Sequence, residues 1–247
     1  MFSYLSSLIR TAGASIRKIY FNTVFKDVSY KIDKSPVTEA DMVAHEIIVN
    51  GLEKLTPGVP ILSEENYSKT YDYSYWNEYW LVDPLDGTKE FINNNHQFTV
   101  NIALIKQGIP ILGFIYVPVF DTLYYSINGL SWKITKEKKK IQVNNLIPPT
   151  ICISKSHSDE RVLNFINTFE DSKIVKAGSS IKFCWLAEGK IQLYPRFGPT
   201  AIWDTAAGHV ILVNAGGYVR NIHDQKSLDY TLSLNNYLNA GFIASSS

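Results

Sequence analysis

Hydrophobic residues near the start of the chain recur at intervals of three and four, which is the period of an amphipathic helix. The positions that form this stripe are Leu5, Leu8, Ile9, Ala12, Ile16, Ile19 and Tyr20. We expect the stripe to pack on the protein core. Attachment to a membrane surface is the alternative, but a few basic residues among serines make a weak interfacial anchor.

A second helix is predicted to begin at Thr38. The sequence TEAD at 38–41 has the pattern of a capping box, with Asp41 as its acidic member. Apolar residues then follow at helical spacing, at Val43, Ile47, Ile48, Leu52 and Leu55. The tripeptide Thr56-Pro57-Gly58 is typical of a helix end. The predicted helix therefore stops there.

Between residues 59 and 135 the pattern favours strands. Two short apolar runs, VPIL at 59–62 and YWLV at 79–82, predict buried strands that acidic residues follow directly. Strand-forming residues then continue from Phe98 to Thr135, interrupted by Asn128-Gly129, a pair typical of hairpin turns. We expect the charged run KEKKK at 136–140 to be a solvated loop between strands, with a phosphate-binding patch as the alternative.

The pattern changes after Pro148-Pro149 to short strands that alternate with helices. Strands are expected at TICIS (150–154), KIVKA (173–177), KIQLY (190–194), GGYVR (216–220) and AGFIA (240–244). Helices are expected near 158–170, 179–188 and 203–215. We therefore expect two halves, an α+β half at 1–148 and an α/β half at 149–247, that form one compact unit.

Composition places the chain of 247 residues among globular proteins, with 45% hydrophobic and 19% charged residues. The 24 basic and 23 acidic residues give a net charge of +1, which argues against binding of long nucleic acid but not of a small anion. Two cysteines, Cys152 and Cys184, lie in apolar stretches and are expected to be reduced core residues of a cytosolic protein. The sequence predicts neither a signal peptide nor a transmembrane segment.

The segment DPLDGT at 83–88 is the first candidate for chemistry. Asp83 and Asp86 follow a predicted strand, and the fixed φ of Pro84 and the freedom of Gly87 allow both carboxylates to converge on one point. Paired carboxylates repel one another unless a cation or a proton lies between them, and a set of oxygen ligands favours Mg²⁺. A turn rich in turn-forming residues is the alternative.

Other acids extend this candidate site. Glu64-Glu65 directly follows a predicted strand, where a ligand role competes with a solvated loop start. Asp204 begins a predicted helix in WDTAAG at 203–208. It could be an ordinary helix cap, or it could offer its carboxylate to a metal while the first-turn amides receive phosphate oxygens.

Two long motifs resemble the signatures of the inositol monophosphatase superfamily, DPLDGTKEF at 83–91 and WDTAAGHVILVNAGG at 203–217. SEE at 63–65 and PVTEAD at 36–41 stand at the expected places upstream, and the resemblance extends from about residue 5 to 244. It implies a layered αβαβα sugar-phosphatase fold of the α+β class and a Mg²⁺-dependent, lithium-sensitive phosphatase. Stretches such as YWLVDPLDGTKEFI and LYPRFGPT are most similar to the bacterial 3'(2'),5'-bisphosphate nucleotidases of that superfamily.

The resemblance implies roles for individual residues. The metal-binding positions are matched by Glu64, Asp83, Asp86, Asp204 and the backbone carbonyl of Leu85. Glu64 and Asp83 would share one Mg²⁺ ion, and the three aspartates would hold a second. Thr88 and Asp41 match the pair that orients the attacking water, with Asp41 also near a third, weaker ion, and Glu65 matches a supporting acid. Asp41 keeps its alternative role as the capping acid, although one oxygen cannot fill both.

Substrate-binding positions are implied in the same way. Ser179, Lys182 and Arg196 match residues that hold a second phosphate and flank adenine, and His157 matches a contact to the base. The ordinary alternatives are an N-cap for Ser179, a surface charge for Lys182 and a rim ion pair for Arg196. The reacting phosphate would lie against Glu64, Asp83, Leu85, Asp86, Gly87, Thr88 and Asp204.

The resemblance implies hydrolysis of adenosine 3',5'-bisphosphate (PAP) to AMP and phosphate, a clearing step in sulfate assimilation, with PAPS as a second candidate substrate. An inositol or sugar monophosphatase is the alternative, and it would not need Lys182 and Arg196. A non-catalytic regulatory binding protein is a remote alternative that the complete set of acids disfavours. Peripheral contact with the cytoplasmic face of the inner membrane stays open, although no segment requires it, and the oligomeric state is not indicated.

Overall fold

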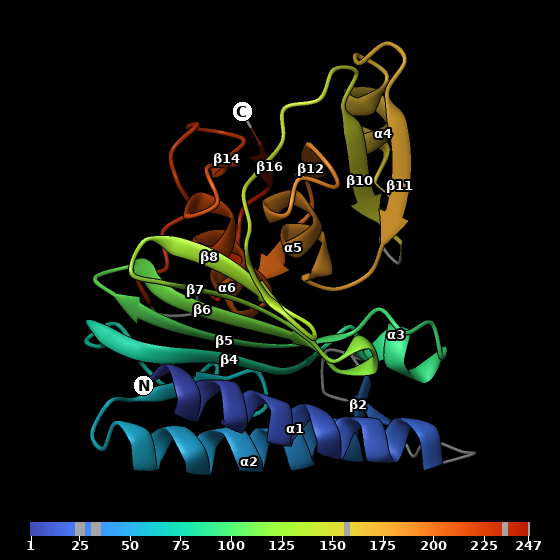
Figure 1. Cartoon of the computed structure of the whole chain (residues 1–247). Helices are drawn as coiled ribbons and strands as arrows, with labels where there is room; N and C mark the ends of the chain where they lie inside the picture. Colours follow the sequence, from blue (N-terminus) through green and yellow to red (C-terminus); the bar gives the residue numbers. More distant parts are fainter. Residues whose placement is uncertain (23–27, 31–35, 156–158, 234–236, 247) are drawn as a thin grey trace.

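Helices and sheets alternate in layers (Figure 1). The structure, a computed structural model, describes residues 1–22, 28–30, 36–155, 159–233 and 237–246. Helices α1 (Phe2–Asn22) and α2 (Glu39–Leu55) cover one face of a seven-stranded sheet, and α5 (Ile181–Ala187) and α6 (Ile202–Val213) lie on its other face. A five-stranded sheet and α4 (Glu160–Ile166) complete the stack. The predicted layered αβαβα architecture is confirmed.

The two N-terminal helices form as their apolar stripes predict. In α1, Leu5, Ile9 and Ile16 are fully buried against the large sheet, so the stripe faces the core and the membrane-surface alternative is wrong. Thr38 precedes α2, and its backbone N–H donates to Asp41 Oδ2 at 2.7 Å, which confirms the predicted helix start.

The large sheet has the order β3-β4-β5-β6-β7-β8-β9. Its strands are β3 (Ile61–Ser63), β4 (Glu78–Asp86), β5 (Thr99–Lys106), β6 (Ile109–Val117), β7 (Thr122–Ile127), β8 (Leu130–Ile134) and β9 (Lys138–Lys140). β3 pairs with β4 in parallel and the other neighbours are antiparallel. Asn128 and Gly129 both have positive φ in the β7–β8 turn, so the predicted hairpin is confirmed.

Two local predictions for this half are wrong. Lys138–Lys140 is an edge strand with exposed side chains rather than a loop, because a strand at a sheet edge tolerates lysines and the charges deter pairing with other chains. Strand β4 continues past Val82, and a register shift between Asp83 and Asp86 accommodates Pro84 within the strand.

The smaller sheet has the order β11-β10-β12-β16-β14. Its strands are β10 (Thr150–Ser154), β11 (Lys173–Ala177), β12 (Leu193–Arg196), β14 (Tyr218–Asn221) and β16 (Phe242–Ser245). All five lie near the predicted segments, but β12 begins three residues later than predicted, because Lys190 and Ile191 still bond to the carbonyl of Trp185 at the end of α5. Short elements complete the chain: β1 (Val28–Tyr30), β2 (Pro36–Thr38), α3 (Thr88–Ile92), the 3₁₀ turn η1 (Pro118–Phe120), β13 (Thr200–Ala201) and β15 (Leu238–Asn239).

One apolar cluster joins the two sheets through α5 and α6. Leu81 and Ile115 from the large sheet, Phe183 and Ile211 from the helices, and Phe242 from the small sheet belong to it. The same cluster contains both cysteines, which are free and buried as predicted. Burial of this shared surface fixes α6 against the large sheet, and α6 carries one of the candidate acids.

We predict that Gly113→Ala destabilises the protein by about 1–3 kcal/mol. A Cβ on Gly113 in β6 would lie 2.6 Å from the carbonyl oxygen of Ala207, so α6 would have to move away from the sheet. The free energy of unfolding in urea measures the effect. Gly198→Ala is the matched control, since among the described residues a Cβ there meets only Asp159 Oδ2, at 3.7 Å. Equal stability of the two variants would contradict this account of the packing.

Candidate active site

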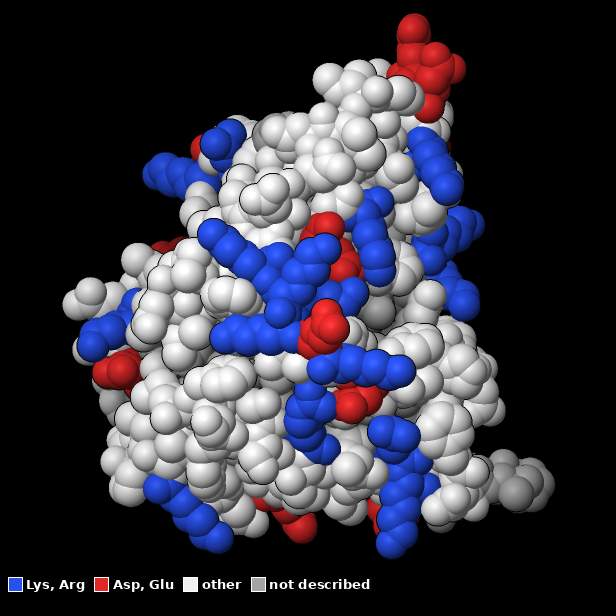
Figure 2. Space-filling view, viewed as in Figure 1, with Lys and Arg blue, Asp and Glu red and all other residues white. Residues whose placement is uncertain are grey.

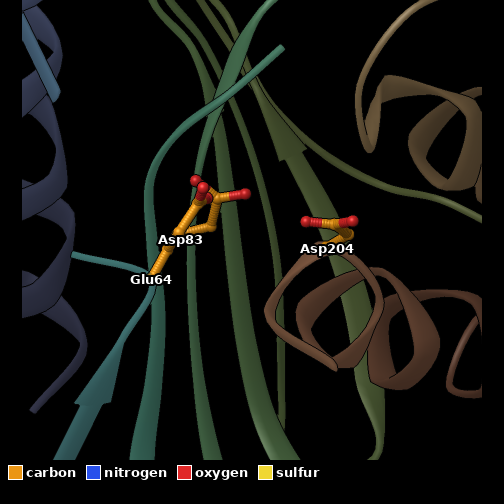
Figure 3. A group of neighbouring side chains, drawn as sticks. All are labelled: Glu64, Asp83 and Asp204. Atoms are coloured by element: carbon orange, nitrogen blue, oxygen red, sulfur yellow. The ribbon is translucent and has the colours of Figure 1, made fainter. Parts of the chain in front are cut away.

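Three carboxylates from separate elements converge at one point. Glu64 directly follows β3, Asp83 lies in β4 and Asp204 lies in the first turn of α6. One ligand oxygen from each lies within 4.8 Å of the others. Figure 3 shows the Asp204 carboxylate facing Glu64 and Asp83 across a gap. Because β3 and β4 are parallel, the acids at their carboxyl ends reach the same edge of the sheet.

Asp83 is the most deeply buried of these acids, with 1% of its surface exposed. Its Oδ1 accepts a hydrogen bond from Leu85 N at 3.0 Å, whereas its Oδ2 has no hydrogen-bond partner among the described residues. Burial, and then the charges of Glu64 and the other acids, raise the pKa of Asp83 well above its usual range. A buried carboxylate oxygen without a donor and beside two further carboxylates fits a divalent cation.

Asp86 lies at the edge of this cluster. Its Oδ2 accepts the backbone N–H of Ser180 at 2.5 Å and the Asn101 side-chain amide at 3.3 Å. Burial raises the pKa of Asp86 to about 6, while the Lys182 ammonium and these hydrogen bonds act in the opposite direction. Asp86 therefore connects the acids of the large sheet with the start of α5.

Asp204 caps its helix and also lies in the acid cluster, two placements that the sequence left as alternatives. Its Oδ2 accepts hydrogen bonds from Thr200 Oγ1 at 2.6 Å and from Ala201 N at 3.2 Å, so it caps the first turn of α6. The same carboxylate belongs to the three-acid cluster. Burial, followed by the charges of Asp86 and Glu64, raises the pKa of Asp204 to about 7.

Asp41 also divides its oxygens between two partners. Oδ2 accepts from the backbone N–H and the hydroxyl of Thr38, at 2.7 and 2.6 Å, while Oδ1 accepts from Thr88 Oγ1 at 3.2 Å. The capping role and the contact with Thr88 therefore coexist on different oxygens. Burial raises the pKa of Asp41 to about 6. Gly87, with φ of 91°, turns the chain between β4 and Thr88.

A cavity of about 260 Å³ contains most of the predicted site residues. Its walls include Glu64, Asp83, Leu85, Asp86, Gly87, Thr88, Ser179, Lys182, Arg196 and Asp204. Asp41 stands behind Thr88 and, like Glu65, does not line the cavity. His157 lies outside the described residues, so its predicted contact with a base stays a prediction.

We call the part of the cavity lining formed by Ser179, Lys182 and Arg196 the basic wall. For each of these three residues the ordinary alternative is wrong. Lys182 is no surface charge: 5% of it is exposed, and its Nζ donates to Ser179 O at 2.5 Å. Ser180, not Ser179, occupies the N-cap position of α5, and Ser179 has a positive φ of 46°. Within the described residues, Arg196 makes no rim ion pair and donates instead to the carbonyls of Gly198 and Pro199 at 3.3 and 3.0 Å.

Some supporting residues were not identified from the sequence. Thr200, Ser180 and Asn101 bond directly to the acids, but neutral polar residues of these types are common on any surface. Only Thr200 had a usable signal, because it lies four residues before Asp204 at a predicted helix start. The other two reach Asp86 across the fold, and nothing local indicates them.

Comparisons with known proteins agree with this geometry. The sequence model of the inositol monophosphatase family matches residues 1–246. The chain is 47% identical over 243 residues to the 3'(2'),5'-bisphosphate nucleotidase CysQ of Salmonella typhimurium, covering 98% of both chains. It is 48% identical to the protein of that name from Buchnera aphidicola, covering 99% of this chain and 93% of the relative. The crystal structure of CysQ from Bacteroides thetaiotaomicron superimposes with a TM-score of 0.84 at 35% identity, covering 99% of this chain and 97% of that one.

We predict that the metal-free protein loses stability as the pH rises from about 4.5 to 7.5. An acid whose pKa is higher in the folded than in the unfolded state contributes stability at low pH that disappears as the pH passes the folded value, about 7 for Asp204. Asp204→Asn should reduce the loss by roughly 1–3 kcal/mol. Urea unfolding with a chelator across this pH range measures it, and Asp224→Asn, an exposed substitution, is the control. Identical pH slopes for wild type and D204N would contradict the prediction.

Proposed function

The chain belongs to the inositol monophosphatase family, a family of metal-dependent phosphatases, and we propose that it is a 3'(2'),5'-bisphosphate nucleotidase. It hydrolyses adenosine 3',5'-bisphosphate to AMP and phosphate, with PAPS as a second substrate. The observation that carries the proposal is the cavity itself. It is lined by acids, among them Asp83 with a buried oxygen that has no hydrogen-bond partner among the described residues, and also by Lys182 and Arg196.

The donor set supports Mg²⁺ as the cofactor. Carboxylates and one carbonyl supply oxygen ligands only, from Glu64, Asp83, Asp86, Asp204 and the backbone of Leu85. Small, hard Mg²⁺ prefers such ligands. When bound, two such ions neutralise phosphate oxygens, acidify a water and stabilise the leaving oxygen. We propose two ions, with Asp41 near the place of a third, weaker one.

Thr88 and Asp41 orient the attacking water in this proposal. The Thr88 hydroxyl donates a hydrogen bond to Asp41 Oδ1. The lone pairs of Thr88 Oγ1 can then accept a hydrogen bond from a water in the cavity. Asp41 is itself fixed by two bonds from Thr38. Glu65 contributes through its charge, which acts on Asp41 without contact with the cavity.

The basic wall receives the second phosphate. Arg196 lines the cavity with a guanidinium held by two carbonyls, and such a planar group suits bidentate contact with phosphate. Lys182 also lines the cavity and adds positive charge, and its ammonium donates a hydrogen bond to Ser179 O. Ser179 offers a hydroxyl at the same wall. Inositol monophosphates have no second phosphate for this wall to bind.

The remaining proposals concern organisation and surroundings. The halves 1–148 and 149–247 act as one catalytic unit, because Asp204 of the second completes the acid cluster of the first. The protein acts in the cytoplasm, where its two buried thiols stay reduced. In Figure 2 the basic side chains gather in the middle of one face with acidic ones among them. The net charge of +1 argues against long nucleic acid as a ligand. No described helix has the length and apolar character to span a bilayer.

We predict that the protein releases phosphate from adenosine 3',5'-bisphosphate in Mg²⁺ at least about tenfold more efficiently, in kcat/KM, than from inositol 1-phosphate. Li⁺ and Ca²⁺ should inhibit the reaction. Asp83→Asn should abolish it, because the cluster loses its most buried carboxylate, whereas D224N should be fully active. Equal rates on both substrates would favour the monophosphatase alternative. No release from either would favour the non-catalytic one.

We further predict that Arg196→Ala raises the KM for the bisphosphate by roughly 10- to 100-fold, and that Arg196→Lys recovers only a small part of the loss. A point charge cannot reproduce the two parallel bonds of a guanidinium. Steady-state kinetics with the bisphosphate measure the effect, and Arg220→Lys on β14, which does not line the cavity, is the control. An unchanged KM in R196A would remove Arg196 from the phosphate site.

A further inference from the structure

A buried tyrosine joins the two elements that carry the acids. Tyr230, 1% exposed, accepts a hydrogen bond on its backbone carbonyl from Tyr79 Oη at 2.6 Å. Its own hydroxyl donates to Thr205 Oγ1 at 3.1 Å. Tyr79 lies in β4 four residues before Asp83 and on the same side of the strand, and Thr205 is next to Asp204 in α6. Tyr230 therefore links the strand of Asp83 to the helix of Asp204.

The link belongs to a longer chain of hydrogen bonds. His209, one helical turn after Thr205, contacts Tyr230 Oη through Nδ1 and Ser227 Oγ through Nε2, each at 3.1 Å. Thr205 Oγ1 in turn donates to Ile202 O at 3.1 Å. Burial lowers the pKa of His209 to about 4, so the imidazole is neutral at pH 7 and donates through one nitrogen.

The donor of each hydrogen bond in this series can be assigned, and donation runs from Ser227 through His209, Tyr230 and Thr205 to Ile202 O. The Tyr230 proton points at Thr205, so His209 Nδ1 carries the hydrogen of its contact with Tyr230 Oη. Nε2 is then the acceptor for the Ser227 hydroxyl. Every hydroxyl and ring N–H from Ser227 to Ile202 is used once, which defines one arrangement of the network.

This series of hydrogen bonds ends at the first turn of α6, which contains Asp204. Thr205 Oγ1 also accepts from Asn239 Nδ2 at 2.7 Å, and Asn239 lies in β15, which pairs with β13. Ala201, at the end of β13, donates its N–H to Asp204. The hydroxyl of Thr205 is thus held from both the Tyr230 side and the Asn239 side, and the first turn of α6 has little freedom to shift.

This restraint matters because the acids repel one another. Asp83 lies in the large sheet, Glu64 directly follows its strand β3, and Asp204 lies in α6, so their repulsion acts to push α6 away from β4. A hydrophobic contact resists separation but not sliding, whereas directional hydrogen bonds resist both. Groups that orient metal ligands commonly control metal affinity.

We propose that Tyr230, oriented by His209, is a positioning residue that holds Asp204 opposite Asp83 and so sets the affinity of the acid cluster for divalent cations. The proposal rests on the metal site proposed above. It predicts that removal of the Tyr230 hydroxyl loosens the first turn of α6 and weakens metal binding while the fold is retained.

The test is direct Mn²⁺ binding by the metal-free full-length protein, with free Mn²⁺ followed by its electron paramagnetic resonance signal. Tyr230→Phe should raise the dissociation constant roughly 3- to 10-fold. Tyr124→Phe is the matched control, because Tyr124 is also buried in the same core cluster and donates to Glu188 Oε1 at 3.1 Å, outside the network. Its Mn²⁺ affinity should equal that of the wild type.

A second pair of variants separates positioning from general destabilisation. Thr205→Val removes the hydroxyl that receives the Tyr230 bond and should weaken Mn²⁺ binding, whereas Thr205→Ser retains it and should bind normally. Wild-type affinity in both Y230F and T205V, or equal weakening in Y124F, overturns the proposal, as does a wild type that does not bind Mn²⁺. A wild type that binds Mn²⁺ but does not cleave the bisphosphate overturns the proposed function alone.

Discussion

Repulsion among buried carboxylates is the constraint on which the rest of the structure depends. Asp83 is enclosed with one oxygen that has no hydrogen-bond partner in the described part of the chain, and Glu64 and Asp204 present further negative charge to the same point. Such an arrangement is costly for the metal-free chain and becomes favourable with a divalent cation. The fold must therefore hold like charges together by contacts other than those of the acids with one another.

Packing supplies most of that restraint. The shared apolar cluster presses α6 onto the large sheet, and Gly113 allows the helix backbone near Ala207 to approach closely. Hydrogen bonds then set the orientation of each acid: Thr200 and Ala201 hold Asp204, Ser180 holds Asp86, and Leu85 holds Asp83. The apolar contacts set how close α6 lies to the large sheet, and the hydrogen bonds set how each carboxylate is oriented.

The near-zero net charge conceals a separation of charges within the cavity. Acids from the β3–β4 edge and from α6 line the cavity together with Lys182 and Arg196, whose charges act on Asp86 and Asp204. The buried Lys182 ammonium donates a hydrogen bond to Ser179 O. Burial lowers the pKa of Lys182, and the nearby Asp86 carboxylate offsets part of that effect. Both kinds of charge in one cavity are what the proposed bisphosphate substrate requires, since metal ions held by the acids would meet one phosphate and the basic side chains the other.

The sequence by itself determined most of the helices and strands, the turn at Asn128-Gly129 and the identity of the acids, because these follow from short-range periodicity, turn chemistry and local motifs. It misassigned 138–140, since only the place of that segment at a sheet edge makes three lysines acceptable in a strand. It also left two alternative roles open for each of Asp41 and Asp204, a helix cap or a part in the site. Tertiary structure decided that Asp41 caps α2 and also contacts Thr88, that Asp204 caps α6 and also joins the acid cluster, and that Tyr230 and His209 lie behind Thr205, which lines the cavity. Those contacts join residues far apart in the chain, where no local pattern encodes which side chains will meet.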